Sequence, residues 1–267
     1  MTAWQRHWGL GHEPFRAHSP PFVATESALQ ALGRLSEALD SAAPRIRLIG
    51  EPGVGKTTVL ARALAISRRP GRRMVVLSGS RGETELPVIL AGRLVPGLSA
   101  GARLADPWAR LERAIATARL EHARIVVAID DASAPRDDQE VSWIDRLIHL
   151  SARAGLELSV VEATSRDHEP RSEGRVGEDC LVARVLPLTR DEAEHFLTAK
   201  LAAAGCEGAI LTPRAITRLH GLALGLPGRI EALATVSLRA AAAAGLEITT
   251  PEIVDAAVSA AFVPTIG

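Results

Sequence analysis

The chain has 267 residues, and its 31 Lys and Arg balance its 31 Asp and Glu, so the formal net charge is zero. This balance excludes the overall basic field of a protein that binds nucleic acid mainly by bulk electrostatics. Two cysteines, Cys180 and Cys206, are too few for a disulfide framework or a closed zinc site, and we expect both to be buried and reduced.

The N-terminal segment has no signal-peptide core, and no stretch approaches the ~18 apolar residues of a membrane span. We therefore expect a soluble cytoplasmic protein without membrane insertion. Residues 1–24 are rich in Pro, His and aromatic residues without periodicity, which predicts an ordered arm rather than a helix. A helix is predicted over residues 25–40, where leucines recur on one face.

Apolar strands and helices then alternate along the chain. Strands are predicted at residues 45–49, 73–77, 124–129, 156–161 and 181–186. Helices are predicted between them at residues 56–67, 86–94, 107–121 and 138–153. This alternation predicts an α/β fold, with a five-stranded parallel sheet covered on both faces. Arg68, Arg69, Arg72 and Arg73 form a basic turn, which we expect to be solvated rather than bound to a phosphate backbone.

Beyond Pro187 the predicted strands stop. Helices are predicted at residues 190–204, 213–222, 228–244 and 251–260. Residues 163–179 are polar and charged and predict a long exposed loop before the last strand. We therefore predict two domains: an α/β domain over residues 1–187, arm included, and an all-α domain over residues 188–267.

Residues 50–58 read GEPGVGKTT and match G-x-x-x-x-G-K-[ST] between a predicted strand and a predicted helix. Glycines let backbone N–H groups surround a polyphosphate at close range. Lys56 is expected to reach the β- and γ-phosphates, and the Thr57 hydroxyl to ligate Mg²⁺. The chain has 29 arginines and two lysines, which favours a need for a compact ammonium at residue 56. The predicted ATP-binding residues are Gly50, Glu51, Pro52, Gly53, Val54, Gly55, Lys56, Thr57 and Thr58.

Residues 125–131 read IVVAIDD, a buried strand that delivers two carboxylates to its carboxyl end. In open α/β sheets, ligands bind at that edge. Asp130 is predicted to hold Mg²⁺, and Asp131 to orient or deprotonate the attacking water.

The order of these motifs resembles that of AAA+ P-loop ATPases. The closer resemblance is to the ExeA-type ATPases associated with type II secretion, whose relatives include the TniB and TnsC transposition helpers. WGLGHEPF at residues 8–15, VLPLTRDEA at 185–193 and GLPGR at 225–229 are similar to segments of that family. The resemblance covers most of the chain, from about residue 4 to 260, and implies a helical lid as the second domain, Mg²⁺ and ATP hydrolysis.

The resemblance also implies roles for individual residues, with departures from the family pattern. Asp131 stands where the family has Glu, which allows for slow hydrolysis because the shorter carboxylate lies further from the water. Thr164, with Ser165 close behind, is placed as the sensor of the γ-phosphate. Arg175 is chosen as the arginine finger, although Arg166 and Arg171 share its loop.

The family also carries an arginine in a Gly-x-Pro-Arg segment of the lid. The corresponding Arg229 is shifted by one residue in Gly-Leu-Pro-Gly-Arg, which on a helix is a rotation of roughly 100°. Whether Arg229 reaches the phosphates stays open. The predicted catalytic set is Lys56, Asp131, Thr164, Arg175 and Arg229.

These features favour a nucleotide-dependent switch or assembly factor that oligomerises with ATP and acts on an unidentified partner protein. One alternative is an ATP-gated scaffold with little hydrolysis, and another is a DNA transposition helper, which the neutral charge does not support. A P-loop kinase is disfavoured, because the last ~80 residues predict a helical domain without an acceptor pocket.

Overall fold

The computed structural model describes residues 1–15, 22–78, 85–95, 106–131, 143–165 and 180–261. The chain forms two compact units. The first, which we call the sheet unit, comprises residues 30–50 and 59–185. The second, the helical unit, combines residues 1–29, 51–58 and 186–267.

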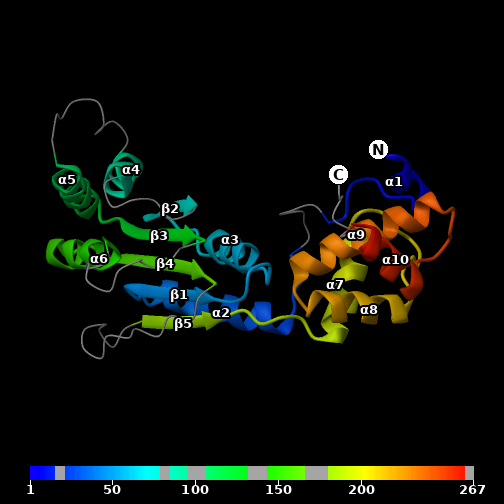
Figure 1. Ribbon diagram of the computed structural model, residues 1–267. Helices are drawn as coiled ribbons and strands as arrows, with labels where there is room; N and C mark the ends of the chain where they lie inside the picture. The colour runs from blue at the N-terminus through cyan, green and yellow to red at the C-terminus, as the bar shows by residue number, and fades with distance from the viewer. Residues whose placement is uncertain (16–21, 79–84, 96–105, 132–142, 166–179, 262–267) are drawn as a thin grey trace, which may run out of the picture. The chain divides into compact units, whose positions relative to one another are not determined.

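The sheet unit contains five parallel strands in the order β2-β3-β4-β1-β5, stacked from top to bottom in Figure 1. Their bounds are β1 (Arg45–Ile49), β2 (Arg72–Ser78), β3 (Arg124–Asp130), β4 (Leu158–Thr164) and β5 (Cys180–Arg184). The predicted five-stranded parallel sheet is thereby confirmed. Because the strands are parallel, their carboxyl ends meet at one edge.

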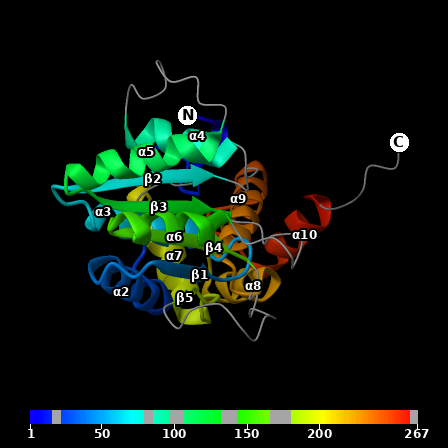
Figure 2. The same ribbon diagram turned by 90° about the vertical axis from the view of Figure 1, so that its left-hand side faces the viewer.

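Helices pack on both faces of this sheet. The helices that lie in the unit, wholly or for most of their length, are α2 (Glu26–Asp40), α3 (Lys56–Ile66), α4 (Glu85–Leu94), α5 (Pro107–Leu120) and α6 (Trp143–Ala154). On one face, Leu111 of α5 and Leu147 of α6 pack in one core with Ile125 and Val160. Figure 2 shows α4 and α5 side by side above the strands. Val126, which points to the opposite face of β3, is also fully buried, so both faces are covered.

Strand β4 lies later in the chain than predicted, over residues 158–164 instead of 156–161. Gly155 ends α6 with a φ of 67°, and the Leu156 N–H still bonds back to the Ser151 carbonyl oxygen. Two residues are therefore used to leave the helix before β4 begins. As a consequence Ala163 and Thr164, predicted to open an exposed loop, are buried strand residues.

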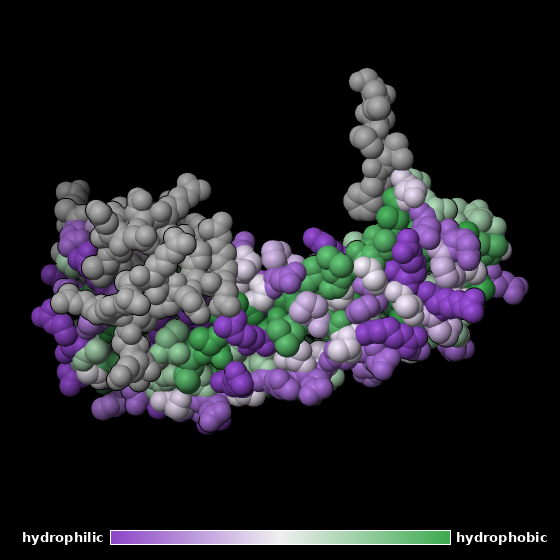
Figure 3. Space-filling view, turned by 60° about the horizontal axis from the view of Figure 1, so that its bottom comes forward, coloured by the Kyte–Doolittle hydropathy of each residue, from purple (hydrophilic) through white to green (hydrophobic). Residues whose placement is uncertain are grey.

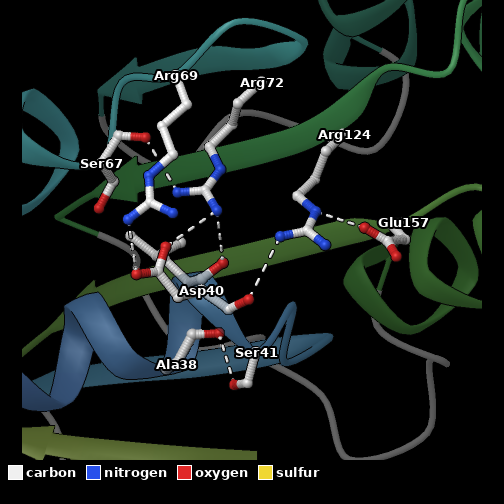
Figure 4. A network of polar contacts seen from close by, with 9 residues as sticks. Ala38, Asp40, Ser41, Ser67, Arg69, Arg72, Arg124 and Glu157 are labelled. Carbon is white, nitrogen blue, oxygen red and sulfur yellow. Dashed lines mark hydrogen bonds and ion pairs between the residues drawn. The ribbon is translucent and has the colours of Figure 1, made fainter.

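The basic turn is held by carboxylates at the amino end of the sheet (Figure 4). Arg69 and Arg72 pair with the two oxygens of Asp40, at 2.9 and 3.1 Å. Arg124 donates to the Asp40 backbone carbonyl at 3.3 Å and pairs with Glu157. The Arg72 side chain is only 4% exposed. The prediction of a solvated turn is therefore wrong for Arg72, whose guanidinium also donates to the Ser67 and Leu39 carbonyl oxygens.

The helical unit contains α1 (Ala3–His7), α7 (Arg190–Ala203), α8 (Pro213–Ala223), α9 (Pro227–Ala243) and α10 (Pro251–Ala261). Thr189 and Thr212 cap α7 and α8, as a Thr before the first turn predicts. Hydrophilic and hydrophobic residues are interspersed on the face shown in Figure 3. Leu186 and Leu224 have exposed side chains. In the described part of the chain, no helix is long and apolar enough to span a bilayer.

The N-terminal arm differs from its prediction in two ways. It contains the short helix α1, which a capping box between Thr2 and Gln5 opens. Its apolar side chains, Trp8 among them, lie in the core of the helical unit rather than against the sheet. The Trp8 Nε1–H donates to the Leu238 carbonyl oxygen of α9 at 3.0 Å. Anchored aromatic residues thus stabilise a helix too short to show a periodicity.

Candidate functional site

The segment between β1 and α3 has the backbone of a phosphate-binding loop. Gly53 and Gly55 have φ values of 82° and 103°, which glycine adopts without strain. Open space surrounds the Cβ position at both, so conformation rather than crowding requires glycine there. Helix α3 begins at Lys56 directly after this turn, so its first N–H groups point toward the loop. An anion is stabilised by such an arrangement.

One backbone carbonyl oxygen in the loop accepts hydrogen bonds from two groups that could also donate to a phosphate oxygen. The Glu51 carbonyl oxygen accepts the Val54 N–H at 3.2 Å and the Lys56 Nζ at 3.0 Å. Both donors belong to the predicted ATP-binding set. The Lys56 side chain is therefore folded back onto the loop.

At the carboxyl edge of the sheet unit, two predicted site residues end neighbouring strands. Asp130 is the last residue of β3 and Thr164 the last of β4. The Thr164 carbonyl oxygen accepts the Gly50 N–H at 3.3 Å, so the end of β4 lies where the chain leaves β1 for the loop. The strand order brings Asp130, Thr164 and Gly50 to one edge. A carboxylate oxygen is a ligand suited to Mg²⁺.

Asp131 has a left-handed backbone, with a φ of 58°, and is exposed. Among non-glycine residues, Asp and Asn adopt this conformation several-fold more often than others. The turn after β3 therefore gives a physical reason for Asp rather than the longer Glu at residue 131. Sequence spacing alone could not have provided it.

The segments around Leu188 and Gly225 contact each other in the helical unit. The Leu188 N–H donates to the Gly225 carbonyl oxygen at 2.8 Å, and His220 Nε2 bonds the Leu188 carbonyl oxygen at 2.8 Å. Gly225 is buried, with a φ of 71°. Its close approach to Leu188 fixes the turn that leads into α9.

Arg229 lies exposed in the first turn of α9. The residue before it, Gly228, makes the contact with the phosphate-binding loop: its N–H donates to the Gly53 carbonyl oxygen at 3.0 Å. The sequence alone indicates only that Gly228 shifts Arg229 by one residue. The three arginines proposed for the finger, Arg166, Arg171 and Arg175, lie outside the described residues.

The second lysine is buried in the helical unit. Lys200 is 7% exposed, and its Nζ lies 3.6 Å from Glu231 Oε1 and 5.7 Å from the Phe196 ring centroid. Burial raises the pKa of Glu231, and the nearby Lys200 offsets part of that rise. This pair links α7 to α9.

The two cysteines are free thiols, and both are half-buried rather than buried as predicted. Cys180 opens β5, and partial burial raises the pKa of its thiol. Cys206 Sγ contacts the Gly208 carbonyl oxygen at 3.2 Å.

Solved structures with a similar fold cover nearly the whole chain. Drosophila ORC bound to DNA superposes with a TM-score of 0.69 at 14% identity, over 98% of this chain and 67% of that one. Cdc6p from Pyrobaculum aerophilum gives 0.69 at 20% identity, over 92% and 70%. The Aeropyrum pernix ORC2 protein in ADPNP–ADP complexes gives 0.64 at 15% identity, over 93% and 71%.

This chain therefore has the fold of AAA+ P-loop ATPases, which confirms the predicted fold class. No protein-family model matches the sequence. No curated protein matches it either. The resemblance to ExeA-type and TniB/TnsC ATPases therefore rests on the sequence motifs alone.

Proposed function

We propose that the chain binds ATP with Mg²⁺ at residues 50–58. The observation that carries the proposal is the loop geometry: Gly53 and Gly55 in left-handed conformations, followed by Lys56 at the start of α3. Lys56 Nζ and the Val54 N–H donate to the Glu51 carbonyl oxygen. When ATP binds, both donate to phosphate oxygens instead. Thr57 and Asp130 would hold the magnesium ion, whose positive charge would offset the charge of the phosphates.

Hydrolysis follows from the residues at the carboxyl edge of the sheet unit. Asp131 orients or deprotonates the attacking water, and Thr164 senses the γ-phosphate from the end of β4. Arg175 of a neighbouring copy and Arg229 stabilise the charge of the transition state. The Asp131 side chain is one methylene shorter than that of Glu, so its carboxylate lies further from the attacking water and turnover is slow.

At the level of the whole molecule, the chain is a nucleotide-dependent switch of the ExeA type that assembles with ATP and acts on a partner protein in the cytoplasm. An ATP-gated scaffold is the first alternative, and it is favoured by the displaced Arg229. A DNA helper of the TniB/TnsC type is the second. The DNA-bound ORC neighbour favours the second alternative, and the zero net charge disfavours it.

Calorimetric titration with ATP and ADP, with and without Mg²⁺, tests nucleotide binding. Lys56→Ala is expected to weaken ATP binding or abolish turnover while the chain stays folded, because the ammonium neutralises phosphate charge. Arg68→Ala, which removes an exposed cation beyond the other end of α3, is the matched control. Absence of affinity at millimolar ATP in the unaltered chain would contradict the proposal.

Phosphate release separates the switch from its alternatives. Release that is measurable in the unaltered chain and lost in Lys56→Ala supports the hydrolase. Release at the level of Lys56→Ala, with ATP still bound, supports the scaffold. Stimulation by duplex DNA at physiological salt favours the DNA helper.

A further inference from the structure

The phosphate-binding loop and the start of α9 are joined through two glycine backbones. The Gly228 N–H donates to the Gly53 carbonyl oxygen at 3.0 Å, inside the helical unit. Gly228 is the second residue of α9, where N–H groups have no partner within the helix. The loop thus satisfies a donor that a helix start otherwise leaves to solvent or to a side-chain cap.

A side chain at residue 228 would press on the loop. A Cβ there would lie 3.3 Å from the Gly53 oxygen and 3.4 Å from its Cα, closer than most Cβ atoms approach backbone. The crowded group is backbone and not the flexible end of a side chain, so the loop itself would have to move. By contrast, Gly221 in α8 has open space at its Cβ position. Glycine at residue 228 therefore has a steric reason that Gly221 lacks.

The peptide group that accepts the hydrogen bond from Gly228 also carries an N–H that can bind phosphate. The Gly53 carbonyl and the Val54 N–H belong to one planar peptide and point in opposite directions. The Val54 N–H now bonds the Glu51 carbonyl oxygen at 3.2 Å. A phosphate that draws this N–H toward itself must turn the whole peptide. The oxygen held by Gly228 turns with it.

We propose that Gly228 is a positioning residue that couples the phosphate-binding loop to α9, so that nucleotide in the loop changes the start of α9 through the Gly53–Val54 peptide. The proposal rests on the proposed ATP binding. It gives a function to the glycine that separates Pro227 from Arg229. Glycine at residue 228 allows a close backbone contact, whereas a side chain there would push α9 away from the loop.

Gly228→Ala tests the coupling without weakening the helix, since Ala is the better helix former. We expect this variant to bind MgADP and MgATP at least about fivefold more weakly than the unaltered chain, the low end of measured couplings between sites. Gly221→Ala, another glycine-to-alanine change within a helix of the same unit, is expected to bind within about twofold.

Hydrogen exchange supplies a readout that a purely structural role would not move. In the unaltered chain, MgATP is expected to change protection of the amides of residues 228–231, and this change is expected to be lost in Gly228→Ala but kept in Gly221→Ala. The change in protection on MgATP binding is measured in the unaltered chain as well, so the coupling can still be tested if Gly228→Ala does not fold.

Two results overturn the coupling alone: equal affinities in Gly228→Ala and Gly221→Ala, or amides 228–231 that do not respond to bound nucleotide. If the unaltered chain binds no nucleotide, ATP binding and the coupling both fail. Protection of the Gly228 amide without nucleotide then still reports whether the contact with Gly53 exists.

Discussion

Gly225 lies so close to Leu188 that a Cβ at residue 225 would be 2.5 Å from the Leu188 carbonyl oxygen. Its φ of 71° adds a second obstacle to any side chain. We expect Gly225→Ala to lower the free energy of unfolding by at least ~2 kcal/mol, from backbone strain and the clash together. Denaturant unfolding measures the loss.

Gly245→Ala is the matched control for that experiment. Gly245 has a similar φ of 69° but open space at its Cβ position, so its cost is only the conformational one, about 1 kcal/mol. Equal losses in the two variants would show that the contact with Leu188 does not restrict residue 225.

Asp40 is expected to hold the buried Arg72 in place. Asp40→Asn removes the carboxylate charge at unchanged volume and leaves a guanidinium that is 4% exposed without its counter-charge. We expect a loss of about 1–2 kcal/mol in urea unfolding. Glu157→Gln, at a carboxylate that is 58% exposed and pairs with Arg124, is expected to cost less than ~1 kcal/mol. The opposite ranking would contradict the assignment.

At residue 131, the effect of the backbone conformation on stability can be measured separately from the effect of the carboxylate on hydrolysis. Asp131→Asn accepts the same φ, and we expect hydrolysis to fall by about 10²-fold while ATP affinity stays within a few-fold. By side-chain length alone Asp131→Glu should keep or raise the rate, but its backbone is expected to destabilise the fold by up to ~1 kcal/mol. Thermal unfolding and phosphate release measure the two effects. A large rate loss in a stable Asp131→Glu would show that the site requires the shorter acid.

The raised pKa of Glu231 predicts a pH dependence of stability. The folded chain holds this proton to a higher pH than the unfolded chain, so the stabilisation is complete below the unfolded pKa and is lost as pH rises through the folded one. Glu231→Gln cannot titrate. We therefore expect its stability relative to the unaltered chain to improve between pH 4 and pH 7 in urea unfolding.

For Glu231, the matched control is Glu247→Gln, which removes an exposed carboxylate from the same unit. A constant difference between Glu231→Gln and the unaltered chain over this pH range would mean that residue 231 does not titrate differently on folding.

An arginine supplied by a neighbouring copy predicts that hydrolysis depends on assembly. We expect specific activity to rise with protein concentration, and Arg175→Ala to bind ATP without hydrolysing it. Mixing Arg175→Ala with Lys56→Ala is expected to restore part of the activity, since each supplies the half-site that the other lacks. Flat specific activity across dilution, with no effect of Arg166, Arg171 or Arg175, would exclude the mechanism in trans.

The sequence predicted those parts of the fold that depend on local pattern. The strands, most helix bounds and the loop around Lys56 follow from apolar periodicity, caps and glycines, which act within a few residues. The arm could not be placed this way, because α1 is stabilised by Trp8 packing against a helix far along the chain. The close contacts of Gly225 and Gly228 could not be predicted from the sequence for the same reason, because each is made with a backbone group of another segment.

The hydrogen bond between Trp8 and Leu238 spans 230 positions of the chain. During synthesis, the arm leaves the ribosome long before the helices that bury its aromatic side chains. Until α9 has emerged, Trp4, Trp8 and Phe15 have no completed core to enter, although the strands of the sheet can already pair. The nascent chain therefore keeps these three aromatic side chains outside a packed core until α9 has been synthesised.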